Sequence, residues 1–493
     1  MRIFSTLFLV TLLGSCAVVS KNYHPNKKFP RESLQADYTL LRHILEAEHP
    51  SLYWYTPKDS MDHLFDAGYR AIGDSMTELQ FGWKILAPLT AAIHCGHTSF
   101  SMSPSWNRFV KNKAIPSFPL YLKVWKDTMV VIYNLNQADT LLKKGTIITA
   151  INGISSSDII RIMLDYMVQD GYAANVNYLR LSESFPYFHR NIFGLYKFYR
   201  VGYLDSSGVA KDTVLPYFEP PVDSLKKFKK LPHPDKNIQK LPRREEVRTL
   251  KIDSSYALMT INSFSKGHLK HFFKKSFRRL HRHQVSNLVI DIRTNGGGDI
   301  SNYVLLARFL RNTPFKVSDS AWSQAKNFRP YTKYITAGFF DNLGLFFLTH
   351  KEKDGKYHFG YWERHEFMPK GVHHFQGATY ILTNGLTFSA STLFCNTVKG
   401  QPGITLVGEE TGGGWYGNSG IMIPDIKLPN TGLRVRLPFF RIVQYHHISQ
   451  KGTGVLPDVY LPPLYRDIVS GTDTKLAWVL QKIKQGGRPT ATE

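Results

Sequence analysis

The sequence predicts an α/β fold, because short apolar strands alternate with amphipathic helices in its carboxyl-terminal half. Segments 287–292, 380–383 and 404–408 are apolar enough for buried strands, and the first two run into glycine-containing corners. The chain has 493 residues, 43% hydrophobic and 20% charged, which suits a globular protein of about two to four domains. This composition excludes fibrous and disordered classes.

The amino terminus predicts export. Arg2 precedes an apolar run, 3–13, that is too short to span a bilayer and is typical of a secretory signal. The run ends in Leu-Gly-Ser-Cys, which resembles a bacterial lipobox, in which the cysteine accepts a lipid before cleavage. We therefore expect a signal peptide at 1–15, a lipidated Cys16 at the start of a linker, 16–33, and a membrane-anchored place in the cell envelope. The alternative is an ordinary signal peptide that contains a cysteine.

The chain carries 62 Lys and Arg against 38 Asp and Glu, a formal net charge of +24. This excess is typical of proteins that bind nucleic acid or an anionic membrane, and it also favours solubility in general. The predicted export argues against binding to nucleic acid. Cys95 and Cys395 permit one disulfide bridge or two buried thiols, which excludes a disulfide-rich framework. His94 and His97 lie near Cys95, but no second ligand pair has zinc spacing, so we expect no metal and no cofactor.

The region 34–110 is predicted to be helical, because apolar residues from Leu34 to Leu45 recur at helical spacing. Gly96 ends the last helix and presents His97 on a turn or strand start. Strand-like runs at 120–125, 129–133 and 144–153, an Asn-Gly turn and a helix follow. This order resembles a PDZ domain, with Thr146 in place of its usual Asp, and we assign it to 111–180.

A basic connecting segment is expected at 181–248. Its most basic part, 226–248, suits a charged linker, with contact to anionic lipid headgroups as the alternative. The α/β core is assigned to 249–470, and a carboxyl-terminal helix and tail to 471–493. The aromatic insertion 314–376 has no clean periodicity and is expected to form a lid or a loop on the substrate side. The elements expected in the core are strands 256–261, 287–292, 380–383 and 404–408, and helices 266–282, 301–310 and 389–399.

Two corners of this core carry residues suited to acyl transfer. After strand 287–292 come three glycines, 296–298, which allow positive φ and point main-chain N–H groups into a cavity. Such donors suit an oxyanion, and neither the Walker nor the dinucleotide phosphate-binding pattern is present. At the second corner Ser389 starts a helix, where the macrodipole stabilises negative charge on a hydroxyl. Ser389 is thus a candidate nucleophile, or a simple helix cap.

The two motifs together, Asp-Ile-Arg-Thr-Asn-Gly-Gly-Gly and then Thr-Asn-Gly-Leu-Thr-Phe-Ser-Ala-Ser, resemble the C-terminal processing and tricorn family of serine peptidases, the tail-specific proteases. That family also carries a PDZ module, and the resemblance covers most of 90–465. It implies a crotonase-like ββα superhelix in the core. It also implies Ser389 as nucleophile and an oxyanion hole formed by the N–H groups of Ala390 and of Gly297 or its neighbour.

One branch of the family uses a Lys about 25 residues after the serine, where this chain has Gly414. Lys399 is no substitute, because ten residues along a helix turn it about 280° from Ser389. Tricorn-like members use a His in a Gly-His-Thr motif, which implies His97 as general base. A structural histidine at 97, or His94 as the base, is the alternative.

A carboxylate or a hydroxyl should orient the base, and the candidates are Asp458, Glu410 and its neighbour Glu409. The tricorn branch also has a Ser before its His, where this chain has Gly96. We therefore expect a serine peptidase that hydrolyses peptide bonds of a polypeptide through an acyl-enzyme on Ser389. The alternative is a non-catalytic lipoprotein that binds peptides or acts as a scaffold on the same fold. The sequence predicts no oligomeric state.

Overall fold

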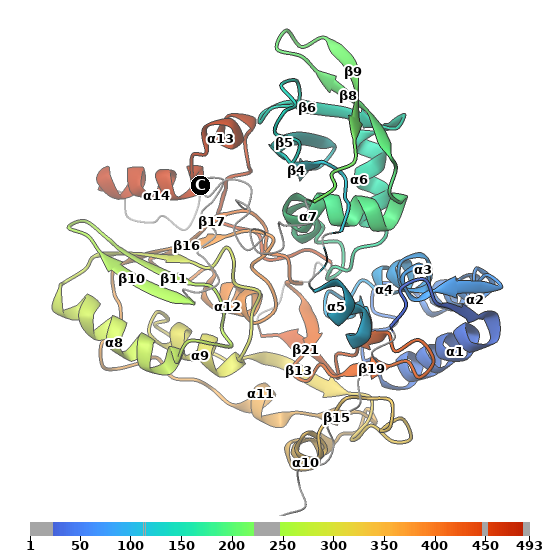
Figure 1. Cartoon of the computed structure of the whole chain (residues 1–493). Coiled ribbons are helices and arrows are strands. Elements are labelled where there is room, and N and C mark those ends of the chain that lie inside the picture. The colour runs from blue at the N-terminus through green and yellow to red at the C-terminus, as the bar shows by residue number, and fades with distance from the viewer. Residues whose placement is uncertain (1–22, 112, 114, 221–246, 446–451, 487–493) are drawn as a thin grey trace, which may run out of the picture.

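The computed structural model describes residues 23–111, 113, 115–220, 247–445 and 452–486, arranged as a helical region, a β-rich unit and an α/β core (Figure 1). The expected signal peptide, Cys16 and nearly all of the basic segment 226–248 lie outside the described residues. Among the described residues, no helix combines the length and the apolar character that crossing a bilayer requires.

The amino-terminal region is helical, as predicted. The leucines that recur from Leu34 to Leu45 lie buried on one face of the first helix. Order starts before the expected boundary, because residues of the expected linker 16–33 form a strand and the start of that helix. The elements are β1 (Lys28–Pro30), α1 (Arg31–Glu48), α2 (Lys58–Arg70), β2 (Ser75–Thr77), α3 (Glu78–Phe81), a π-helical turn (Gly82–Leu86), α4 (Ala87–Ala92), β3 (Phe100–Ser101) and α5 (Pro104–Val110).

The β-rich unit has the predicted strands, Asn-Gly turn and helix. Asn152 and Gly153 both have positive φ, 51° and 82°, as a tight turn of this kind requires. The unit continues beyond 180, so the expected connecting segment is wrong over 181–216, where a helix ends and a hairpin joins the same antiparallel sheet. Its elements are β4 (Leu120–Trp125), β5 (Thr128–Asn134), β6 (Ile147–Ile151), β7 (Ile154–Ser155), α6 (Ser156–Leu164), α7 (Asn175–Phe193), β8 (Phe198–Leu204) and β9 (Ala210–Pro216).

The α/β core contains a six-stranded sheet in the order β10-β11-β12-β16-β17-β22, parallel except for the β10–β11 pair. Alternate residues of β12 face opposite sides: Leu288 and Ile290 pack with α8, α9 and α12, and Val289 packs with α14. All four predicted strands and all three predicted helices are confirmed to within a few residues. The strands of the sheet and the helices around it are β10 (Arg248–Ile252), β11 (Ala257–Ile261), α8 (Leu269–Arg282), β12 (Asn287–Asp291), α9 (Ile300–Arg308), β16 (Ala378–Thr383), α12 (Ala390–Val398), β17 (Ile404–Gly408), β22 (Val459–Tyr460), α13 (Tyr465–Ser470) and α14 (Thr474–Lys484).

The aromatic insertion 314–376 is built into a second sheet, in the order β14-β15-β13-β21-β18, rather than lying over the core as a loop. Phe328 and Ile335 from this insertion are buried in the same apolar cluster as α1 and α2. The expected lid is therefore wrong for these parts, which gain their order from long-range pairing that sequence periodicity does not show. The elements are β13 (Ser318–Ser323), α10 (Phe339–Leu348), β14 (His350–Lys351), β15 (Tyr357–His358), α11 (Gly360–Arg364), β18 (Gly417–Gly420), β19 (Asp425–Lys427), β20 (Arg434–Arg436) and β21 (Phe440–Gln444).

Candidate active site

Ser389 lies on a strained corner between β16 and α12. Its φ and ψ are 54° and −123°, a region that residues with a side chain rarely adopt. The residue occupies the N-cap position of α12, yet its side chain makes no capping hydrogen bond. The capping interpretation is therefore wrong, and the strained backbone turns the hydroxyl away from the helix that it precedes.

Hydrogen bonds join the two glycine-containing corners. The Phe388 N–H donates to the Asn295 carbonyl at 3.1 Å, and the Thr387 hydroxyl donates to the Ile292 carbonyl at 3.1 Å. Asn295 and Thr387 are fully buried, so these contacts are shielded from water. The corner that carries Ser389 is thus fixed to the residues that directly precede the glycine triplet.

Gly297 lies directly against Ser389 and has a φ of 102°. A Cβ at this position would lie 2.7 Å from the Ser389 Cβ and 2.9 Å from the Ala390 nitrogen. Glycine therefore leaves open the space in front of the Ala390 amide, which has no acceptor among the described residues. The Gly297 amide itself donates to Asn295 Oδ1 at 3.0 Å. Of the two predicted oxyanion donors, the Ala390 amide has no acceptor among the described residues, whereas the Gly297 amide is bonded to Asn295.

His97 follows α4 and reaches Ser389 from the amino-terminal region. Its Nε2 lies 3.1 Å from the Ser389 Oγ, within the range needed for proton transfer. The imidazole is buried, with 7% of the residue exposed, and its ring packs against Phe388 with centroids 4.8 Å apart. The structure therefore brings together the two residues that the sequence singled out, although 292 positions separate them in the chain.

Burial lowers the pKa of His97 below its usual value, because a charged imidazolium loses its hydration there. The charge of Asp170 opposes this by raising the pKa, and those of Arg436 and Arg180 lower it further. A neutral imidazole at neutral pH is the form that accepts a proton from a hydroxyl. The other ring nitrogen, Nδ1, is buried and has no partner among the described residues.

Asp170 positions the loop that carries His97, and sequence reasoning missed it. Its Oδ1 accepts a hydrogen bond from the Gly96 N–H at 2.7 Å, and its Oδ2 accepts one from the Gly414 N–H at 3.2 Å. A Cβ on Gly96 would lie 2.6 Å from the Phe388 ring, so only glycine allows this approach. The sequence marks Asp170 only as an Asp-Gly turn.

The carboxylates predicted to orient His97 are engaged elsewhere, and none of them contacts its Nδ1, so the structure does not support these assignments. Asp458 forms an ion pair with Lys399 and accepts the Leu406 N–H at 2.8 Å. Glu410 accepts the Gly454 N–H at 2.6 Å, and burial raises its pKa. The neighbouring Glu409 forms a buried ion pair with Lys475. Sequence spacing could not reveal these partners, because all of them come from segments distant in the chain.

The remaining candidates also find structural roles. The His94 imidazole contacts the Gly171 carbonyl at 2.8 Å, which argues against it as the base. Cys95 and Cys395 are buried and unpaired, so the sequence alternative of two buried thiols is confirmed. Burial raises the pKa of Cys95 to about 11, which makes it a poor nucleophile.

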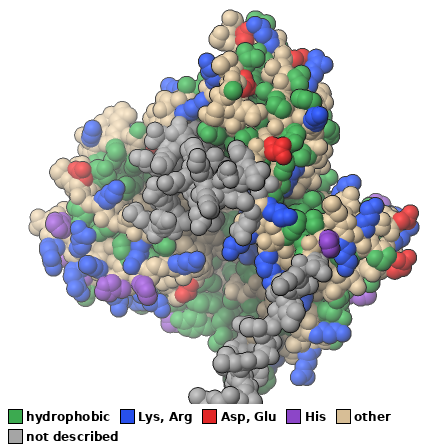
Figure 2. All heavy atoms as spheres, viewed as in Figure 1, with side chains coloured by type: hydrophobic (Ala, Val, Ile, Leu, Met, Phe, Trp, Pro, Cys, Tyr) green, Lys and Arg blue, Asp and Glu red, His purple; other side chains and the backbone are tan. Residues whose placement is uncertain are grey.

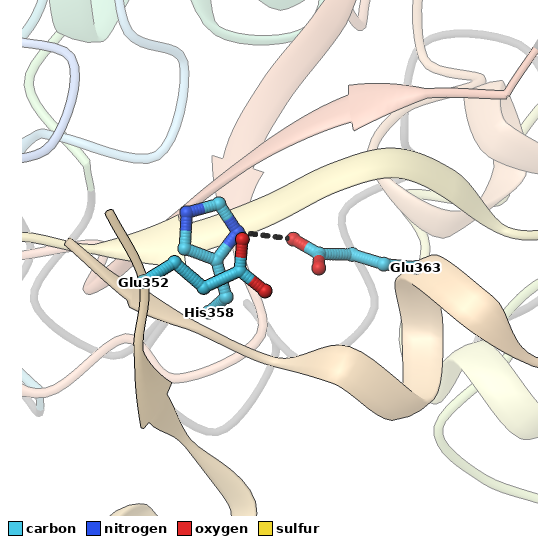
Figure 3. A group of neighbouring side chains, drawn as sticks. All are labelled: Glu352, His358 and Glu363. Atoms are coloured by element: carbon cyan, nitrogen blue, oxygen red, sulfur yellow. Dashed lines mark hydrogen bonds and ion pairs between the residues drawn. The ribbon is translucent and has the colours of Figure 1, made fainter. Parts of the chain in front are cut away.

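One group of side chains among the described residues has the composition of a cation site: Glu352, His358 and Glu363 (Figure 3). His358 Nδ1 lies 2.7 Å from a Glu363 oxygen, and Nε2 lies 3.2 Å from Asp354 Oδ2. Burial lowers the pKa of His358, but these two carboxylates raise it more, so the net shift is upward. The His358 ring thus already bridges two carboxylates here. The group belongs to the β14–β15 hairpin and α11, which contribute nothing to the Ser389–His97 contact.

Comparison with known proteins finds one family match and crystal structures with a similar fold. Residues 255–461 match the description "Peptidase family S41". Two crystal structures share the fold: a mutant of CPAF, with a TM-score of 0.63 and 13% identity over 94% of this chain and 99% of that one, and mature CPAF, with a TM-score of 0.61 and 13% identity over 92% and 98%. Among curated protein sequences, none matches significantly.

Proposed function

We propose that the chain is a serine peptidase of family S41, which residues 255–461 match, with Ser389 as nucleophile and His97 as general base. A peptidase acts on polypeptides, so the substrate class follows from the family. The contact that carries the residue assignment is the 3.1 Å separation of His97 Nε2 and Ser389 Oγ.

The proposed reaction proceeds through an acyl-enzyme. His97 Nε2 takes the hydroxyl proton while the Ser389 oxygen attacks the scissile carbonyl. The Ala390 N–H donates to the oxyanion that forms, and the imidazolium gives its proton to the leaving amine. Water, deprotonated by the same imidazole, then attacks the ester and releases the carboxylic acid and the free serine.

The strained backbone at Ser389 supports this role. A φ of 54° at a residue with a side chain is costly, and such strain concentrates at functional sites. A serine on a sharp turn from strand to helix is also the arrangement that exposes nucleophiles in other hydrolases. A serine that served only as a cap would use its hydroxyl for α12, whereas this hydroxyl contacts His97.

Replacement of the serine tests the proposal. Ser389→Ala should reduce cleavage of an unfolded protein substrate by at least about 1,000-fold while leaving thermal unfolding unchanged. Ser391→Ala is the matched control, because this buried hydroxyl lies two positions on and has no hydrogen-bond partner among the described residues. A serine-reactive fluorophosphonate should label the unsubstituted chain and the control but neither Ser389→Ala nor His97→Ala. Undiminished turnover by Ser389→Ala would reject the nucleophile assignment.

A non-catalytic role as a peptide-binding scaffold is the second candidate. Two observations favour it: His97 Nδ1 lacks a partner among the described residues, and Gly297 directs its amide to Asn295. Failure of the fluorophosphonate to label the folded chain, with peptide binding retained, would support the scaffold over the peptidase.

We further propose, from the leader sequence alone, that the protein is a lipoprotein of the cell envelope attached through Cys16. Radiolabelled palmitate should enter the unsubstituted chain in a bacterial host and should not enter Cys16→Ser. Equal labelling of both would overturn this anchor.

A further inference from the structure

Helix α8 presents a continuous basic face to solvent. Of its fourteen residues, those with exposed side chains are all Lys, Arg or His, and the opposite face buries Leu269, Phe273, Phe277 and Leu280. The exposed residues of α8 are Lys270, His271, Lys274, Lys275, Arg278, Arg279, His281 and Arg282. At 1.5 Å per residue this basic face is about 21 Å long.

Helix stability does not account for this pattern. Like charges four residues apart, such as Lys270, Lys274 and Arg278, repel one another and destabilise a helix. Basic residues in the first turn also oppose the helix dipole. The helix contains no Asp or Glu, and no ion pair joins it to a carboxylate in the part of the chain that the structure describes. These unneutralised charges are therefore available to an external anion.

A neighbouring segment extends the basic face. The Lys370 N–H donates to the Arg308 carbonyl at 2.7 Å, and the ring of His373 lies 5.3 Å from that of His281 on α8. Partial burial and the charges of Arg308 and Lys274 lower the pKa of Lys370, which shows that these cations lie close enough to interact.

Two apolar side chains flank Lys370 and are open to solvent. Met368 is 56% exposed and Val372 is 71% exposed. The Met368 carbonyl accepts a hydrogen bond from Arg308 Nε at 2.7 Å, which fixes this loop beside the basic residues. Basic side chains at headgroup depth with apolar side chains beside them form the pattern by which peripheral proteins bind anionic bilayers.

We propose that the basic face of α8, together with loop 368–373, docks the protein on an anionic phospholipid surface. In Figure 2, blue and purple side chains follow one another over the face where Figure 1 shows α8. The bilayer is the favoured partner because the charge is spread along a helix rather than gathered in a pocket, and because the apolar residues lie at its edge. This contact is independent of the peptidase reaction and of any lipid on Cys16.

Vesicle binding by the full chain tests the proposal. Vesicles of phosphatidylcholine with and without 40% phosphatidylglycerol separate the anion-dependent part of binding from any contribution of the apolar leader. The quadruple variant Lys274→Gln, Lys275→Gln, Arg278→Gln and Arg279→Gln retains good helix formers. Since each basic residue near such a surface changes affinity about fivefold, this variant should lose at least about 100-fold of the phosphatidylglycerol-dependent affinity.

The matched control removes the same number of charges elsewhere: Lys126→Gln, Lys143→Gln, Lys197→Gln and Lys353→Gln, all exposed residues outside the core. It should keep the phosphatidylglycerol dependence within about threefold. Equal losses in both quadruple variants would overturn the docking face in favour of total charge. Undiminished binding by the α8 variant would also overturn it, and circular dichroism would verify that both variants fold.

The loop supplies a second measurement. Met368→Ser with Val372→Ser should weaken binding to phosphatidylglycerol vesicles about tenfold at high salt, where charge is screened and apolar insertion remains. Duplex DNA is the competing polyanion. If DNA binds with equal affinity and the same dependence on α8, and the double serine variant binds vesicles normally, the lipid assignment is wrong.

Discussion

The corner that carries Ser389 and the loop that carries His97 reach the same site by different means. The corner is set by its own local sequence, a strand followed by Asn-Gly and a helix, and by direct contact with the neighbouring glycine triplet. The loop that carries His97 is set by Asp170, which belongs to the β-rich unit. Ser389 is thus positioned within one folding unit, whereas His97 depends on contacts between three regions of the chain.

The largest effect on kcat is expected from a substitution beside Ser389, in the glycine triplet. Gly297→Ala places a Cβ within 2.9 Å of the Ala390 nitrogen and forces a positive φ on alanine, so it should block the space for an oxyanion. We expect kcat to fall by about 100- to 1,000-fold, as when an oxyanion donor is lost. Gly296→Ala is the control, because its Cβ would meet nothing within 4 Å. Equal activity of the two variants would show that Gly297 is not part of the site.

The next largest effect is expected from removing the hydrogen bonds that position the loop of His97. Asp170→Ala removes the acceptors of the Gly96 and Gly414 amides and should lower kcat/KM by about 10- to 100-fold. The charge of Asp170 raises the pKa of His97, so its removal in Asp170→Asn should lower that pKa. The acid limb of the kcat/KM profile of this variant should therefore move to lower pH. Asp458→Asn is the control and should leave this profile in place. An acid limb unmoved in Asp170→Asn would show that the carboxylate acts only as a structural tie.

The pH dependence of the unsubstituted chain sharpens the same comparison. Because burial lowers the pKa of His97, the imidazole stays neutral to lower pH than a solvated histidine. Activity should rise with pH through this lowered pKa, with the midpoint of the acid limb below about 6.5. Stopped assays of kcat/KM between pH 4.5 and 8 measure it, and a midpoint above 7 would contradict the burial effect.

The smallest effect concerns stability in the insertion. The pKa of His358 is raised in the folded state, so its ion pairs stabilise the protein below the unfolded-state pKa and lose this effect as pH rises through the folded value. His358→Gln should lower the free energy of unfolding by about 1 kcal/mol at pH 6 and by less at pH 8. Urea unfolding measures it, with the exposed His365→Gln as control. A loss that grows with pH would refute the charged imidazole.

Much of the core could be predicted because its signals are local. Buried strands such as 287–291 appear as apolar runs, and Ser389 appears as a serine at a helix start beyond an Asn-Gly corner. The His97 assignment came from the resemblance of Gly-His-Thr to a family motif. Asp170 could not be predicted, since its role depends on hydrogen bonds to two backbone amides distant in sequence.

Two of the wrong predictions, for Asp458 and for the insertion, share one physical cause, which is pairing over long sequence separations. Asp458 was predicted to orient His97, but it forms an ion pair with Lys399. The insertion showed no periodicity because β13 pairs with β21, more than one hundred positions later. The hairpin β8–β9 was missed for a different reason, because Phe198 and Val214 are apolar yet exposed, which breaks the alternation of apolar and polar residues that predicts a strand.

The apolar cluster beneath the first helices also contains residues from close to the end of the chain, including Ile426, Val435 and Ile442. Strand β3, just after His97, pairs with β20. A nascent chain therefore cannot complete the surroundings of its imidazole until about nine-tenths of its length has been synthesised. The order of synthesis alone therefore delays the contact between His97 and Ser389 until late in translation.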